Sequence, residues 1–277
     1  MPATQTRRTR PPAAAIPPRR DRVRAAWATM VTALLGLLFT GLTATTLALW
    51  ANDATYSETN PVVDLAFFAL GGILVTAGLA SQIRVPRVAG LQQAVVALVV
   101  LSVAGGLGGR VEPFLGPLVL LAAAAPLVVL HPDRRQLLAS GAGGSKPLAV
   151  LAAVAAVPAA VYAAGMLDRA RTAGPSCFLG QCALGDRYAE AAALAVAVAV
   201  VALLAAARTE GWRLPAWSAG AAAALLGVAS LFFPGQVGAL SPVWSVAAVM
   251  WGLALVLVGE YQQRAPTRPQ AHDDPSR

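Results

Sequence analysis

Charged residues are scarce in this chain of 277 residues and make up 12% of it. A typical soluble domain carries about twice that fraction. Hydrophobic residues make up 57%, and they occur in long blocks without the period of an amphipathic helix. The shortage of charge therefore argues against a soluble globular domain and indicates a membrane protein.

The short alternating segments typical of a transmembrane β-barrel are also absent. The apolar blocks instead run for roughly 18 residues or more, which is long enough to cross about 30 Å of hydrocarbon as an α-helix. A helix satisfies its own backbone N–H and C=O groups in that environment. We therefore predict an all-α polytopic membrane protein with about eight transmembrane helices, at residues 25–50, 62–80, 88–107, 113–130, 148–167, 188–207, 215–233 and 242–259.

Basic residues are unevenly distributed between the two sides of the membrane in this predicted topology. Seventeen of the 21 Lys and Arg fall in the tails and loops of one side, and the other four are Arg110, Arg169, Arg171 and Arg187. Such a bias marks the cytoplasmic side of a membrane protein. The sequence thus predicts cytoplasmic termini, with the protein in the cell membrane. We expect no nucleic-acid partner despite the net charge of +8, because no aromatic residue interleaves the arginines of the amino-terminal tail.

The polar stretches divide the chain into five parts. Both ends are polar and contain proline, which predicts disordered tails. Each of two larger parts holds four apolar blocks, and a glycine-containing cytoplasmic hinge joins them. The boundaries are 1–24 (tail), 25–130 (first half), 131–147 (hinge), 148–260 (second half) and 261–277 (tail).

The two halves share a faint pattern. Arg-x-Pro opens the third and seventh blocks, at residues 84–86 and 213–215, and an acid, Asp64 or Glu190, lies just inside the second and sixth. An even number of helices in each half would keep both halves in one orientation, as parallel repeats require. This favours the hypothesis of a four-plus-four repeat. The alternative is that Arg-x-Pro is a common loop start and that alanine-rich helices resemble one another.

Cysteine is rare too, since Cys177 and Cys182 are the only two. Both lie in the polar stretch 168–187, on the predicted outer side, where an oxidising environment favours a disulfide. Closing so small a ring would contribute only about 2 kcal/mol on the chain-entropy model. A redox-active pair is the weaker alternative, because thiol–disulfide enzymes favour a Cys-x-x-Cys spacing. Two thiols without a nearby histidine leave a zinc ligand set incomplete.

Ionisable residues within spanning segments are candidates for function. Asp64 and Glu190 lie within about a turn of the outer surface, and Arg110, Glu112, Asp168, Asp186 and Arg187 are expected at a similar depth. Together these residues are predicted to line an outer polar vestibule, with Asp64, Arg110, Glu112, Arg187 and Glu190 as its candidate site residues. The alternative is that they are wet interfacial residues, since acids in a first helical turn favour the helix dipole anyway.

Sequence motifs that would indicate a particular reaction are absent. The sequence has no nucleophile motif, phosphate-binding loop or metal-ligand spacing, and its two histidines cannot clamp a haem between helices. We expect no cofactor, metal or catalytic residue. The first hypothesis is a non-enzymatic membrane component or accessory subunit, with the bilayer and another membrane protein as partners. The second is a small permease or channel-like conduit that uses the outer vestibule. A membrane enzyme ranks third, because no residue pair defines its chemistry.

Overall fold

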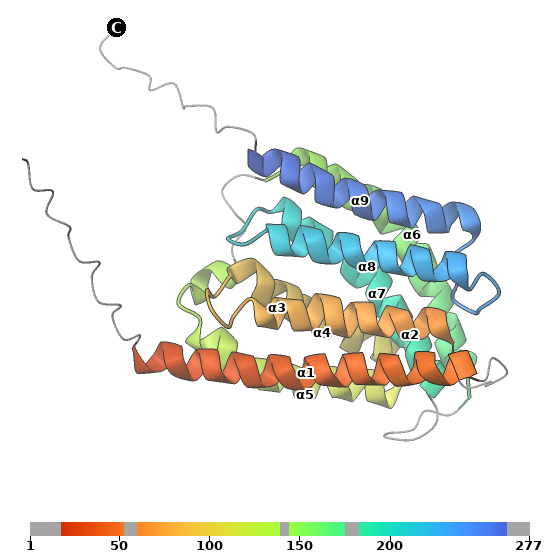
Figure 1. Cartoon of the computed structure of the whole chain (residues 1–277), viewed down its shortest axis with the longest axis horizontal. Coiled ribbons are helices and arrows are strands. Elements are labelled where there is room, and N and C mark those ends of the chain that lie inside the picture. Colours follow the sequence, from red (N-terminus) through yellow and green to blue (C-terminus); the bar gives the residue numbers. More distant parts are fainter. Residues whose placement is uncertain (1–17, 53–59, 139–143, 175–182, 265–277) are drawn as a thin grey trace, which may run out of the picture.

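The computed structural model describes residues 18–52, 60–138, 144–174 and 183–264, and their regular structure is entirely helical (Figure 1). Eight helical segments in these ranges are long and apolar enough to cross a membrane, which confirms the predicted class. They are α1 (Arg19–Asn52), α2, η1 and α3 as one span (Pro61–Phe68, Ala69–Thr76 and Ala77–Ala80), α4 (Val88–Gly108), α5 (Val111–Leu130), α6 (Lys146–Thr172), α7 (Ala183–Ala206), α8 (Arg213–Phe232) and α9 (Pro242–Arg264). A short 3-10 helix, η2 (Arg134–Leu138), follows α5.

Helix ends follow local sequence signals. The Asn60 side chain accepts from the N–H groups of Val62 and Val63 at the start of α2, which satisfies donors that the helix cannot. Gly109 ends α4 with φ of +68°, a left-handed conformation that glycine adopts without strain. These signals explain why most predicted boundaries agree with the structure to within a few residues.

Four predicted boundaries need correction. Helix α9 ends at Arg264, so residues 261–264, which we assigned to the carboxyl-terminal disordered tail, are helical. Helix α1 begins at Arg19, so residues 19–24, which we assigned to a disordered tail, are helical. Helices α6 and α7 extend into the polar stretch 168–187 from both sides, because Arg and Asp are compatible with helix ends that project beyond the apolar zone. Cys177 and Cys182 lie outside the described residues, and their disulfide stays a prediction.

The eight spans form two rows of four (Figure 1). One row runs α1, α2–α3, α8 and α9, and the other runs α5, α4, α7 and α6, with neighbours in contact along and across the rows. The α2–α3, α4, α7 and α8 spans are mostly buried, whereas α1, α5, α6 and α9 are mostly exposed. Between the charged helix ends, the exposed large side chains of the outer spans are apolar. Such a surface is favourable in a bilayer, because the lipid chains around it are themselves apolar.

Close helix packing is built on small residues. A Cβ atom added to Gly220 of α8 would lie 2.6 Å from the carbonyl oxygen of Gly252 on α9. Gly78 at the end of the second span approaches Gly90 of α4 in the same way, at 2.5 Å. Glycine at these crossings lets the helix backbones meet, which is the usual source of packing energy between membrane helices.

The second span is interrupted by a π-helix, η1, over Ala69–Thr76. The wider turn leaves backbone groups without their ordinary partners, and these must be satisfied inside the bundle. The Gln93 side chain of α4 donates from Nε2 to the carbonyl oxygen of Leu74 at 2.7 Å, and Thr76 Oγ1 donates to Gly71 at 2.8 Å. The Phe39 ring of α1 occupies the space where Gly71 has no side chain. Gln93 therefore stabilises this segment through a hydrogen bond from a neighbouring helix.

Helix α1 is attached to the bundle by polar bonds near its first turns. Arg24 is buried and donates from Nη1 to the carbonyl oxygen of Gln82 at 2.5 Å. Trp27 Nε1 donates to the carbonyl of Ala123 on α5 at 2.8 Å. His131, at the end of α5, is buried close by, and its Nδ1 accepts from the N–H of Asp133 at 3.1 Å. That bond requires a neutral ring with its proton on Nε2.

Lowering the pH is expected to destabilise the protein through His131. Burial lowers the pKa of His131 below its ordinary 6.5, and Arg24 acts in the same direction, while Asp133 and Glu210 oppose both. The unfolded chain therefore binds this proton more readily, so stability is complete above about pH 6.5 and falls as the pH drops below it. Unfolding temperature measured against pH in detergent tests this. The variant His131→Asn should lose part of the dependence, and an unchanged profile would contradict the assignment.

Candidate functional site

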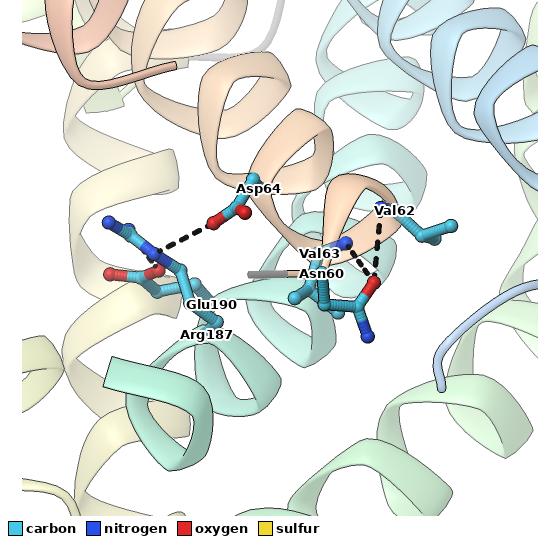
Figure 2. Close-up of polar contacts among 6 residues, drawn as sticks. All are labelled: Asn60, Val62, Val63, Asp64, Arg187 and Glu190. Carbon is cyan, nitrogen blue, oxygen red and sulfur yellow. Dashed lines mark hydrogen bonds and ion pairs between the residues drawn. The ribbon is translucent and has the colours of Figure 1, made fainter. Parts of the chain in front are cut away.

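Arg187 on α7 lies between two acids at the end of the bundle predicted to face outward (Figure 2). Its Nη1 donates to Glu190 Oε2 at 2.7 Å, one turn along the same helix, and its Nε lies 3.4 Å from Asp64 Oδ1 on α2. The guanidinium carbon also stands 3.7 Å from the centre of the Phe67 ring, a cation–π contact. This cluster of Asp64, Phe67, Arg187 and Glu190 joins α2 to α7 through one side chain.

The cluster is fixed by the start of α2. Asn60 caps that helix through its Oδ1 (Figure 2). Its Nδ2 donates to the carbonyl oxygen of Val237 at 2.7 Å. One residue thus sets the register of Asp64 and ties α2 to the turn between α8 and α9. Asp64 is four residues after Asn60 and Phe67 seven, so both side chains lie on one helical face.

Arg110 belongs to a separate contact. It precedes α5, is 2% exposed, and donates from Nε to the carbonyl oxygen of Ala170 on α6 at 2.8 Å, with its Nη2 bonded to the same oxygen. Its guanidinium packs directly against Gly185 of α7, where any side chain would displace it. Arg110 therefore joins the α4–α5 turn to α6 and α7. The structure does not bring it into the Arg187 cluster by any contact that the described residues make.

Glu112 and Asp186 complete the charged residues at this end of α5 and α7. Glu112 is half-buried and forms no ion pair with the side chains in the described ranges. Asp186 is buried, and its Oδ1 has no hydrogen-bond partner among the described residues. Sequence reasoning placed Asp186 at the depth of the vestibule but did not choose it as a candidate site residue, although it is next to Arg187. Asn60 and Phe67 were missed as well, because their roles depend on contacts with other helices.

At the centre of the predicted vestibule, Asp64, Arg187 and Glu190 are packed against one another. Asp64 and Glu190 are each 6% exposed, and both acids are bonded to the same arginine. A buried charge is tolerated when it is paired and hydrogen-bonded. No group of three His, Cys, Asp or Glu side chains within the described part of the chain is placed to hold a metal. The geometry is suited to fastening α2 to α7.

The fold and this cluster define a polytopic helical membrane protein in which two buried acids, Asp64 and Glu190, share one arginine. No family model, curated protein or solved structure matches the chain. Its function therefore has to be argued from its own residues.

Proposed function

We propose that the protein is a non-enzymatic component of the cell membrane that acts by packing against another membrane protein. The observation that carries this proposal is the burial of the polar residues on which a conduit would depend. Asp64 and Glu190 are each 6% exposed and Gln93 is fully buried. A substrate path lined by these three side chains would leave them accessible to water. Their bonds to neighbouring helices instead fit a rigid scaffold.

Helix α6 offers the outer face best suited to a partner helix. Its exposed large side chains in the spanning part are valines, Val150, Val154, Val157 and Val161. The exposed residues between them are small, at Ala153, Ala156, Ala160 and Ala164. Stiff valines lose little side-chain freedom on contact, and small residues allow close backbone approach. Helix α9 instead exposes long side chains such as Met250, Leu253 and Leu257, which suit lipid.

Photo-crosslinking in the native membrane tests the proposal. A photoreactive amino acid at Val157 of α6 is expected to form an adduct of discrete mass with another membrane protein. The same residue at Leu253 of α9 serves as the matched control, because both positions are exposed and apolar, and it should form few protein adducts. Equal lipid-only labelling at both positions would contradict the proposal.

A second candidate function, a small conduit, has one observation in its favour. The second span contains the eight-residue π-helix η1, and the Oε1 of the buried Gln93 beside it has no partner among the described residues. Irregular turns of this kind are frequent at functional sites. Solute flux through proteoliposomes that contain the purified chain would favour this candidate, and flux that Gln93→Leu abolishes would place the path at η1.

We further propose cytoplasmic termini and a four-plus-four repeat. The arginine bias supports the orientation, and a carboxyl-terminal reporter that is active only outside the cytosol would overturn it. The repeat is supported by the neighbours of each span. Helix α1 packs on α2 as α6 packs on α7, α4 on α5 as α8 on α9, and α2 on α8 as α7 on α4. An experimental structure in which the helices of the two halves fail to superpose would rule the repeat out.

A further inference from the structure

Three segments rich in arginine lie at the end of the bundle where α1 begins, an end that can be located in Figure 1. They are residues 19–24 of α1, the turn 81–87 and residues 131–137, which include the start of η2. These segments carry eight arginines and two acids, Asp21 and Asp133, which gives a net charge of six positive. We refer to these three segments together as the basic surface.

Hydrogen bonds hold the three segments together. Arg24 Nη1 donates to the carbonyl oxygen of Gln82, which fastens α1 to the turn 81–87. Arg20 Nη2 donates to the carbonyl of Val129 at 3.1 Å, which fastens α1 to the end of α5 just before the third segment. Gln92 of α4 donates from Nε2 to the carbonyl of Leu137 in η2 at 2.8 Å. The arginines therefore belong to one continuous surface with a fixed arrangement, although they are far apart in the sequence.

Most of these arginines face outward without an acidic partner. Six of them are exposed and form no ion pair with the described residues: Arg19, Arg22, Arg84, Arg87, Arg134 and Arg135. Like charges gathered this closely repel one another, so the surface favours an external anion. The guanidinium fork matches the geometry of a phosphate group.

Two exposed valines beside the arginines indicate that the anion is part of a molecule with an apolar region. Val23, between Arg22 and Arg24, is 52% exposed, and Val85, next to Arg84, is 59% exposed. Apolar side chains alternating with arginines at the end of a membrane span are suited to the boundary between acyl chains and headgroups. A soluble anion or a nucleic acid would give the valines no apolar contact.

We propose that the basic surface binds the headgroups of anionic phospholipids in the leaflet that it faces. The exposed guanidinium groups contact the phosphate diesters, while Val23 and Val85 enter the top of the acyl region. Arg20 and Arg24 donate hydrogen bonds to backbone carbonyl groups. They therefore fix the arrangement of the basic surface, and the six exposed arginines bind the lipid. Anionic lipid would thereby bridge α1, the turn 81–87 and η2.

The test uses the full chain in nanodiscs of phosphatidylcholine, with and without phosphatidylglycerol. The anionic lipid is expected to raise the unfolding temperature of the wild-type protein. The variant Arg84→Gln/Arg134→Gln should lose at least half of that rise and should match the wild type in phosphatidylcholine alone. The control Arg169→Gln/Arg264→Gln also removes two exposed arginines, both outside the basic surface, and should keep the whole rise.

Screening and charge rescue provide independent readouts. High salt should reduce the rise for the wild-type protein, because it weakens attraction between exposed charges. Arg84→Lys/Arg134→Lys should restore most of the rise, since the charge is kept. The proposal is overturned if phosphatidylglycerol stabilises the Gln variant and the control equally, or if it stabilises the wild type no more than phosphatidylcholine does. The salt comparison on the wild type decides the matter even where the Gln variant fails to fold.

Discussion

Replacing Arg187 with methionine is expected to reduce the free energy of unfolding by about 3–5 kcal/mol, the usual cost of removing one partner from a buried ion pair. Arg187 is the side chain that bonds both Asp64 and Glu190. Without it, two nearly buried carboxylates lose their counter-charge in surroundings that water hardly reaches. The Phe67 ring also loses its cation. Unfolding followed by circular dichroism as SDS is added to detergent micelles measures the loss.

Two further variants test whether the loss of stability comes from the charge of Arg187 or from the fit of its side chain. Arg169→Met changes an exposed arginine at the end of α6 and should cost less than about 0.5 kcal/mol, as most surface substitutions do. The triple variant Asp64→Asn/Arg187→Met/Glu190→Gln removes all three charges at once. It should recover most of the lost stability, because neutral replacements of a buried ion cluster are often tolerated. A triple variant as unstable as Arg187→Met would show that the fit of the arginine matters more than its charge.

The second large effect is expected at the crossing of α8 and α9. Gly220→Ala should destabilise the protein by about 1–3 kcal/mol, the typical cost of overpacking. The added Cβ would lie 2.6 Å from the carbonyl oxygen of Gly252 and 2.8 Å from Cγ2 of Val256. Both contacts are too short, and one of them is with backbone, so the two helices have to separate. The same SDS titration reports the change.

Gly116→Ala on α5 is the matched control for this substitution. A Cβ atom there meets nothing within 4 Å, so the change adds helix propensity without a clash. It should be neutral or stabilise by up to about 1 kcal/mol. Equal stability of the Gly220→Ala and Gly116→Ala proteins would mean that the α8–α9 crossing does not depend on the absence of a side chain.

The helix boundaries were largely predictable because their signals are local. Pro61 starts the second span, Gly109 ends α4, and Ser145 caps α6 through its hydroxyl group. The extended start of α1 was missed because residues 19–24, four of which are arginines, resemble a disordered tail in composition. In the structure, Arg24 bonds to Gln82 and Arg20 bonds to Val129, and these contacts with other helices attach the first turns of α1 to the bundle.

The candidate site was predicted in part. Depth along the spans placed Asp64, Glu190 and Arg187 at one level, and the structure brings these three together. Depth alone could not show that Arg110 lies outside this cluster. In the structure Arg110 contacts Ala170 of α6 and Gly185 of α7 instead. The π-helix in the second span was not predicted either, because it depends on Gln93 and Phe39 from other helices.

The sequence alone determined the class of this protein and the positions of the eight apolar spans that the described residues form, because a hydrocarbon layer of fixed thickness selects apolar blocks of similar length. The tertiary structure decided which spans are neighbours and which charges meet. Lipid solvates any apolar helix face equally well, so hydrophobicity cannot choose a partner for a helix. Close backbone contacts such as that of Gly220 with Gly252, and bonds between helices such as that of Arg187 with Asp64, make the choice.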